Sequence, residues 1–304
     1  MSNGTIVIQS GMLPDLVVSA DPSGNGLVSL QWLNGNDPNQ QWTMEPATGG
    51  FYLRNAATGT YLTATGNNSR VVLNPHGDVW QKTGPDDQFT AIRLVLNPDQ
   101  NLNALGANPV VGTAIGTWTW SGGKGNETWA IANVAAVWPR PTKKLSFVSG
   151  MAAYLQLSVN PGDIAGPLVV DDNFSSGAPA GNFAFTVTTW SRGFSIVNQA
   201  SGLLAYVSAY GNGARLLQRP AGQMNADALW TYGANGTFQA VRPWADDDQN
   251  WNVFGNPHPI PKGVLAMGTW SWGGGQANEI WQTVSASVAR EAAPSALWQP
   301  EAAV

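Results

Sequence analysis

The sequence predicts an all-β protein built from two copies of one domain. The segment Gly116–Trp129 returns as Gly268–Trp281, an offset of 152 residues, with Trp-x-Trp, a glycine-rich turn and Asn-Glu-x-Trp in the same order. Short apolar runs alternate with clusters of Asn, Gly, Asp and Pro about every ten residues, and no segment keeps a helical period. The 304 residues are enough for two such domains, each with its own core.

The composition narrows the class of partner. Charged residues make up 11% of the chain and the formal net charge is −5, which argues against binding of a phosphate backbone by lysine and arginine. Nucleic acid is therefore not an expected partner. The 15 tryptophans offer flat, uncharged ring surfaces as well as core volume. The chain has no cysteine, so its stability cannot depend on disulfides or thiolate metal sites.

The sequence also bears on localisation. The chain opens without a basic lead-in or a long apolar run, and no later segment has the roughly 20 apolar residues that a membrane span needs. We therefore expect no signal peptide and no transmembrane segment. A cytoplasmic protein, or one released by a non-classical route, is the corresponding expectation.

The first half is predicted to consist of short strands separated by turns. Their lengths and spacing are typical of a β-barrel or β-sandwich. The expected strands are Thr5–Ile8, Leu16–Ser19, Val28–Trp32, Trp42–Met44, Phe51–Leu53, Tyr61–Ala64, Val71–Leu73, Phe89–Val95, Ala114–Trp118 and Trp129–Ile131.

Each half divides further into three units of about 40 to 50 residues. In the first half, each unit closes on an aromatic residue that we expect to be a buried wedge. The three closures are Asn39-Gln40-Gln41-Trp42, Asp86-Asp87-Gln88-Phe89 and Asn126-Glu127-Thr128-Trp129. In the second half the closing aromatic residues are Phe185, Trp230 and Trp281. This recurrence predicts a threefold barrel in each half.

The domain boundaries follow from these units. The first domain is predicted to span residues 1–137 and the second residues 145–287. Two prolines within four residues interrupt regular pairing and mark residues 138–144 as a linker. The alanine- and proline-rich residues 288–304 form a tail.

These closures resemble the motif of the ricin B-type β-trefoil lectins, whose units end in Gln-x-Trp preceded by Asn or Asp. The segment Asn39-Gln40-Gln41-Trp42 matches it literally, and the other closures are variants. The resemblance covers about residues 1–288 and implies two tandem β-trefoil domains with pseudo-threefold symmetry. It also implies a lectin that binds glycans containing galactose or N-acetylgalactosamine on glycoproteins or glycolipids.

In that family a shallow pocket beside a closure holds a sugar on an aromatic platform, between an early polar residue and the closing Asn. The resemblance places the surest pockets in the third unit of each half. Their residues are Asn103, Trp118, Asn126 and Glu127 in the first half, and Asn252, Trp270, Asn278 and Glu279 in the second. The opening unit offers Trp32, Asn39 and Gln40, with Val18 where the family has an acid.

The third units depart from the family pattern of an early Asp and a late Gln. They have Asn early and Glu late, so acid and amide are exchanged. A carboxylate only accepts hydrogen bonds, whereas an amide both donates and accepts. From the sequence, our hypothesis is that the exchange preserves sugar binding and changes which sugar is preferred.

Other interpretations stay open for the same residues. Asn126 and Asn278 can instead cap their own turns, and the two Glu residues can instead form salt bridges or face water. Trefoils also serve as protease inhibitors, actin-bundling proteins and receptor-binding parts of toxins, so a protein-binding module without sugar binding is the alternative function. Exposure of Trp32, Trp118 and Trp270 would favour sugar, and burial of all three would favour protein.

The sequence gives little support to catalysis. Its two histidines, His76 and His258, stand in turn sequences without a nucleophile or metal-ligand partner, so we expect no catalytic residue, metal or cofactor. A carboxylate pair such as Glu127 with Asp99 is the least favoured option. Two weak pockets on one chain would bind a multivalent glycan with avidity. Association of two chains into a homodimer stays open.

Overall fold

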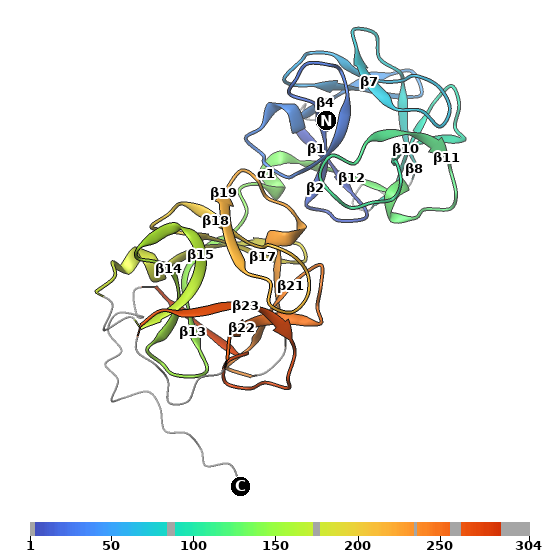
Figure 1. Cartoon of the computed structure of the whole chain (residues 1–304). Helices are drawn as coiled ribbons and strands as arrows, with labels where there is room; N and C mark the ends of the chain where they lie inside the picture. Colours follow the sequence, from blue (N-terminus) through green and yellow to red (C-terminus); the bar gives the residue numbers. More distant parts are fainter. Residues whose placement is uncertain (1–3, 84–88, 173–176, 234–235, 256–262, 287–304) are drawn as a thin grey trace. The chain divides into compact units, whose positions relative to one another are not determined.

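The computed structural model describes residues 4–83, 89–172, 177–233, 236–255 and 263–286 (Figure 1). The chain divides into two compact units, Met1–Arg140 and Pro141–Val304, which we describe separately as the first and second domains. A strand already begins at Thr142, inside the range predicted as linker. The predicted tail, residues 288–304, lies outside the described residues.

Six strands of the first domain pair into a closed ring. β1 pairs with β4 and β12, β4 with β5, β5 with β8, and β8 with β9. A bridge between Thr90 and Trp129 closes the ring, so no barrel strand keeps an open edge. The strands are β1 (Ile6–Ser10), β4 (Trp42–Ala47), β5 (Gly50–Asn55), β8 (Trp80–Thr83), β9 (Ala91–Leu94) and β12 (Trp129–Asn133).

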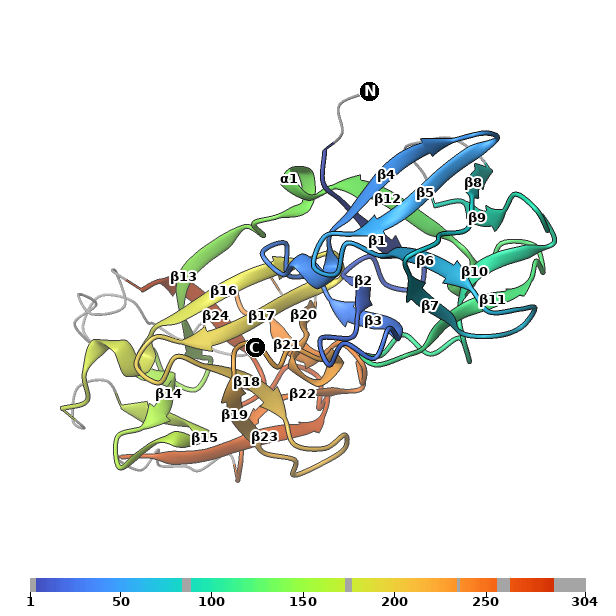
Figure 2. The ribbon, with the colours of Figure 1, turned by 90° about the horizontal axis from the view of Figure 1, so that it is seen from above.

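Three hairpins are inserted between these barrel strands, one in each unit. They are β2 (Leu16–Ala20) with β3 (Val28–Trp32), β6 (Tyr61–Ala64) with β7 (Val71–Asn74), and β10 (Gln100–Ala104) with β11 (Ile115–Thr119). The hairpins touch one another through the bridges Leu27–Val72, Ser29–Ala114 and Arg70–Gly116. In Figure 2 the second and third hairpins of this domain lie side by side. The helical turns are η1 (Pro38–Gln40), η2 (Gly125–Glu127) and α1 (Val134–Val137).

The second domain repeats this plan. Its barrel strands are β13 (Thr142–Ser149), β16 (Phe185–Trp190), β17 (Gly193–Asn198), β20 (Trp230–Gly233), β21 (Ala240–Pro243) and β24 (Trp281–Ser285), with a bridge from Gln239 to Trp281. Its hairpins are β14 (Leu155–Asn160) with β15 (Asp163–Asp172), β18 (Leu203–Val207) with β19 (Leu216–Pro220), and β22 (Gln249–Val253) with β23 (Leu265–Ser271). Short turns η3 (Ala180–Phe183) and η4 (Ala226–Ala228) precede β16 and β20.

One buried ring per unit explains the threefold arrangement. Trp42, Trp80 and Trp129 are fully buried. Each indole Nε1 donates a hydrogen bond to a hairpin carbonyl, at 3.0 Å to Val18, 3.1 Å to Leu62 and 2.8 Å to Leu102. In the second domain Phe185, Trp230 and Trp281 hold these places. The predicted fold, two tandem β-trefoils with pseudo-threefold symmetry, is confirmed.

The second wedge of the first domain differs from the prediction. Phe89 is 40% exposed, whereas Trp80 is fully buried and pairs with Phe51 as Trp42 pairs with Ile6. The prediction was wrong because the segment before Trp80 contains no Asn-Gln pair, while Gln88-Phe89 imitates the motif. Residues 86–88 of the predicted closure lie outside the described residues.

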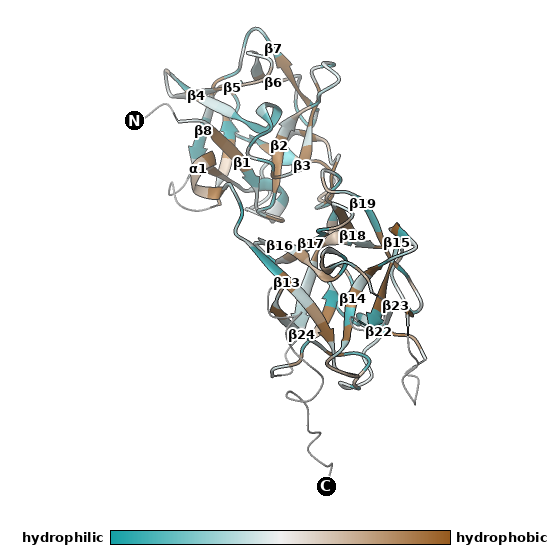
Figure 3. Ribbon diagram, turned by 90° about the vertical axis from the view of Figure 1, so that its left-hand side faces the viewer, coloured by the Kyte–Doolittle hydropathy of each residue, from teal (hydrophilic) through white to brown (hydrophobic). Residues whose placement is uncertain are grey.

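The hydrophobic residues lie mainly along the strands, for example in β1 and β23 (Figure 3). In the second domain Trp251 is fully buried at the centre of the core. Its ring meets Trp230 and Trp281 edge to face, at centroid distances of 5.0 and 5.9 Å. These contacts combine area burial with favourable aromatic geometry.

Candidate functional site

The structure explains which residue stands at each position of the triplet Gly-Thr-Trp in the repeated motif. A Cβ atom on Gly116 would lie 2.5 Å from the carbonyl oxygen of Ser69, and one on Gly268 would lie 2.2 Å from that of Ala214. Glycine is therefore required where the hairpin of the second unit crosses the hairpin of the third. The neighbouring Thr117 is fully buried and donates a hydrogen bond of 2.6 Å to the Gly66 carbonyl.

The tryptophan of the triplet points outward because strand residues alternate between faces. The preceding threonines Thr117 and Thr269 are fully buried, whereas Trp118 and Trp270 are 47% and 46% exposed. Both rings therefore offer an accessible surface, as the sequence predicted for a platform.

Two asparagines of each third unit are joined by a hydrogen bond. The Nδ2 of Asn126 donates to the Oδ1 of Asn103 at 3.1 Å, and the Nδ2 of Asn278 donates to the Oδ1 of Asn252 at 2.9 Å. One member comes from the first strand of the hairpin and the other from the closure. The Oδ1 of Asn278 is buried and accepts no hydrogen bond within the described part of the chain.

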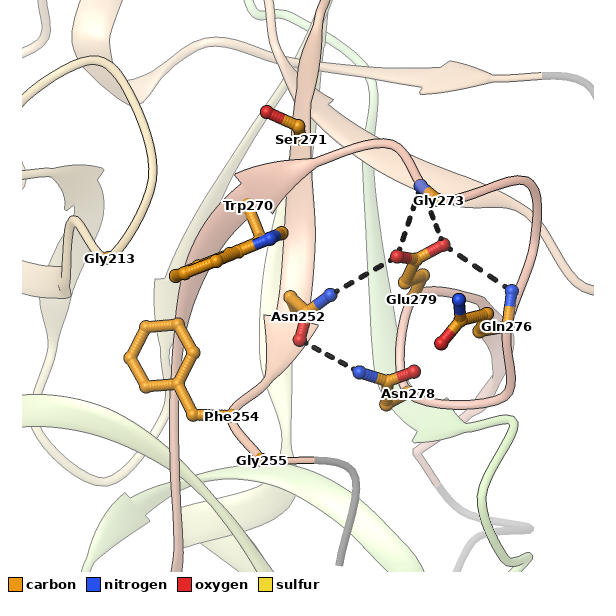
Figure 4. Close-up of a pocket in the computed structure, with 10 residues that line it drawn as sticks. All are labelled: Gly213, Asn252, Phe254, Gly255, Trp270, Ser271, Gly273, Gln276, Asn278 and Glu279. Carbon is orange, nitrogen blue, oxygen red and sulfur yellow. Dashed lines mark hydrogen bonds between the residues drawn. The ribbon is translucent and has the colours of Figure 1, made fainter.

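The two glutamates of the closures are bound by the glycine-rich turns. Glu279 is buried and accepts backbone N–H groups of Gly273 at 3.1 Å and of Gln276 at 3.3 Å (Figure 4). It also accepts from the Gly275 amide at 3.3 Å. Glu127 is also buried and accepts from the amides of Ser121 and Gly123, each at 3.2 Å. Carboxylates suit these positions because every partner is a donor.

Gln40 of the opening unit occupies the same position and explains the exchange of acid and amide. Its Oε1 accepts from the Asn34 amide at 2.7 Å and its Nε2 donates to the Trp32 carbonyl at 2.8 Å. A side chain that faces one backbone donor and one backbone acceptor must be an amide. A side chain that faces only backbone donors is best a carboxylate. The choice of Gln or Glu at the late position thus follows the backbone of the turn. Glu279 also lines the pocket described below, so an effect of the exchange on sugar preference stays a prediction.

The third unit of the second domain contains a pocket of about 520 Å³. Trp270 and Phe254 form two of its walls, with ring centroids 6.4 Å apart and an interplanar angle of 70°. Figure 4 shows the two rings on one side and the Asn252–Asn278 pair on the other. The lining residues are Gly213, Asn252, Phe254, Gly255, Trp270, Ser271, Gly273, Gln276, Asn278 and Glu279.

The opening unit lacks the predicted platform. Trp32 is only 7% exposed, so it offers no open ring face. The strand register gives the reason: Gln31 lies opposite Val17, the place that Trp118 takes opposite Asn101.

The early polar residue of that unit is also displaced by one position from the prediction. Ser19 corresponds to Asn103, because it follows the carbonyl that accepts from the wedge tryptophan. Val18, which was predicted there, supplies that carbonyl. Asn39 is half-buried, and its Nδ2 donates to Asp37 at 2.9 Å.

The second unit of the second domain has other residue types at the three positions that Asn252, Trp270 and Asn278 take in the third unit. Arg219 lies opposite Leu204 as Trp270 lies opposite Asn250, while Tyr206 and Asp227 correspond to the asparagine pair. The Arg219 guanidinium lies 4.4 Å from the centroid of the Tyr206 ring and donates to Asp227, in one case at 2.9 Å. Sequence reasoning missed this cluster because it contains none of the expected residue types.

An exposed tyrosine lies close to this ion pair. Partial burial raises the pKa of Tyr210, and the carboxylates of Asp227 and Asp246 raise it further. Among the described residues, no group of three or more His, Cys, Asp or Glu is arranged to hold a metal ion. The helices in the described ranges are also too short or too polar to cross a membrane.

Each of the two domains is a β-trefoil whose third unit carries an exposed ring and a hydrogen-bonded asparagine pair. The resemblance inferred from the closures is confirmed for the start of the chain, since residues 3–74 match the family model described as "Ricin-type beta-trefoil lectin domain-like". No curated protein matches the chain.

Solved structures of lectins and toxins resemble the chain at low identity. The hemolytic lectin CEL-III is 16% identical with a TM-score of 0.46, covering 92% of this chain and 63% of that one. A ricin B-like lectin of Macrolepiota procera, in complex with lactose, is 23% identical with a TM-score of 0.39, covering 44% and 97%. A mosquitocidal holotoxin is 17% identical with a TM-score of 0.40, covering 93% of this chain, which spans 34% of the holotoxin.

Proposed function

We propose that the protein is a non-enzymatic lectin that binds glycans containing galactose or N-acetylgalactosamine through the third unit of each domain. The single observation that supports this most is the exposure of Trp118 and Trp270, at 47% and 46%, each in a unit with a hydrogen-bonded asparagine pair. Exposed indole rings are unusual because such large apolar surfaces are normally buried.

The chemistry of a sugar fits this arrangement. The C–H face of a pyranose covers an aromatic ring while its hydroxyls point sideways to polar groups, and the ring contact is worth about 1 kcal/mol beyond area burial. The Oδ1 of Asn278 accepts no hydrogen bond from the described residues, so a sugar hydroxyl that reached it would satisfy a buried acceptor. The Nδ2 of Asn278 uses both of its N–H groups on Asn252 and the Val253 carbonyl, whereas the Nδ2 of Asn252 has one contact, at 3.5 Å to Glu279, and keeps a second N–H that can donate to a hydroxyl.

Two sites on one chain would act together. A single shallow site binds weakly, but a second contact on the same multivalent glycan proceeds at high effective concentration when the spacing fits. Glycoproteins and glycolipids on cell surfaces are the corresponding partners. We expect agglutination of cells that display such glycans.

The test is a glycan array probed with the wild type and with the double variant Trp118→Ala/Trp270→Ala. We expect selective binding by the wild type and a loss of at least tenfold in the variant, since each ring supplies about 1 kcal/mol or more and both sites are needed for avidity. Circular dichroism and the melting temperature show whether the variant remains folded.

A matched control is Phe89→Ala, which removes another exposed ring, 40% accessible, that does not line the pocket of Figure 4. The control should bind like the wild type. A wild type that binds no glycan would contradict the lectin proposal and favour the protein-binding alternative.

A further inference from the structure

The two third-unit sites differ in the residue two positions after the early asparagine. The second domain has Phe254 there and the first domain has Leu105. Both side chains lie against the glycine of the Gly-Thr-Trp triplet: a Cβ on Gly268 would come within 2.4 Å of Phe254 Cζ, and one on Gly116 within 2.8 Å of Leu105 Cδ1. The position is therefore equivalent, and only the second domain places a ring in it.

Phe254 is held in place from two sides. The Arg215 guanidinium lies 5.3 Å from the centroid of its ring, and the edge contact with Trp270 has a centroid distance of 6.4 Å. Cation–ring and edge-to-face contacts both favour a defined ring orientation. At an interplanar angle of 70°, the two rings form an apolar corner and cannot both face a single flat pyranose.

The pocket extends past the platform toward Phe254. Its volume of about 520 Å³ lies within the range of sites that hold drug-sized ligands, roughly 300 to 1,000 Å³. Gly213 and Gly255 line this space without side chains, and a Cβ atom built on either would meet no described residue within 4 Å. A pocket of this volume accommodates a ligand larger than one sugar ring beside Trp270.

We propose that the second domain recognises two consecutive sugar residues, with the terminal residue on Trp270 and the next residue against Phe254. The first domain, with Leu105, recognises the terminal residue alone. This inference rests on the proposed lectin function and assigns the two sites different ligands. It makes Phe254 a determinant of ligand length.

The experiment measures the affinities of the full chain for methyl β-galactoside and for lactose by titration calorimetry. A Trp118→Ala background isolates the second-domain site. There we expect tighter binding of lactose, and we expect Phe254→Leu to lower the ratio of the two affinities by about three- to tenfold, the value of one aromatic contact. The variant copies the residue of the first domain, so it keeps an apolar side chain at the position.

The reciprocal variant sharpens the test. In a Trp270→Ala background, Leu105→Phe should raise the preference of the first domain for lactose. Equal losses for both sugars in Phe254→Leu would overturn the inference, because Phe254 would then only support Trp270. Lactose binding no tighter than methyl β-galactoside would overturn it as well. If the wild type bound neither sugar, the lectin proposal itself would fail, which is a distinguishable result.

Discussion

The second and third units of the second domain share one scaffold but differ in what they present to solvent. Trp230 and Trp281 are both buried wedges at the closure. At the platform position, however, Trp270 is 46% exposed, whereas the Arg219 side chain is only 18% exposed. Equivalent backbone positions thus give an open site in one unit and a closed one in the next.

The difference extends over three positions together. Asn252, Trp270 and Asn278 of the third unit become Tyr206, Arg219 and Asp227 in the second. The third unit joins its amides and leaves the ring uncovered, while the second unit covers its ring with a guanidinium and neutralises that charge with a carboxylate. The fold supplies equivalent places in the units compared, and the side chains at these positions decide whether a place is open to a ligand.

The largest expected difference is between the stability losses caused by removing a wedge tryptophan and by removing a platform tryptophan. Trp230→Ala removes a fully buried ring, so we expect the free energy of unfolding of the second domain to fall by about 3 to 5 kcal/mol. Trp270→Ala removes a half-exposed ring and should cost less than about 1 kcal/mol while abolishing glycan binding by that domain. Chemical denaturation of both variants measures the difference; similar losses would contradict the division into wedge and platform.

A smaller loss of stability is expected from changes in the glycine-rich turn. Of the two units compared, the third holds this turn with a carboxylate and the second does not. Ala228 stands in the second unit at the position of Glu279. Glu279→Ala removes the acceptor of three backbone amides, Gly273, Gly275 and Gln276, so the free energy of unfolding should fall by about 1.5 to 3 kcal/mol.

Glu279→Gln tests the donor–acceptor argument directly. Its amide N–H groups would face backbone donors, so we expect a loss close to that of the alanine variant. The matched change Gln40→Glu should also destabilise the first domain, because Gln40 donates to the Trp32 carbonyl. If Glu279→Gln were as stable as the wild type in urea unfolding, neither the charge of Glu279 nor the number of hydrogen bonds it accepts would determine the stability of this turn.

Much of this organisation follows from the sequence alone. The repeat around Trp129 and Trp281 predicted two threefold domains, because a buried ring with fixed neighbours recurs wherever the barrel recurs. The platform tryptophans Trp118 and Trp270 could be inferred for the same reason. Their exposure agrees with that prediction, whereas their binding of sugar stays a proposal.

What the sequence did not predict depends on strand register and on tertiary contacts. Gln31 and Trp32 are consecutive, and a shift of one position along a strand moves a side chain to the opposite face. Trp80 was missed because its closure lacks the motif, although its ring makes the same contacts as Trp42. The turn partners of Glu279 and the pairing of Arg219 with Asp227 depend on loops whose conformation local residue patterns do not determine.

The smallest effect concerns the closed site of the second unit. Arg219→Ala breaks the ion pair with Asp227 and uncovers Tyr206, but both charged side chains keep some solvent contact, so the free energy of unfolding should fall by only about 0.5 to 1 kcal/mol. Because the third units are untouched, binding to the glycan array should be unchanged. The double variant Arg219→Ala/Asp227→Ala controls for the carboxylate left behind. A marked loss of glycan binding on removal of Arg219 would mean that the second unit itself contacts the ligand, and an open ring would then not be required for a trefoil unit to bind.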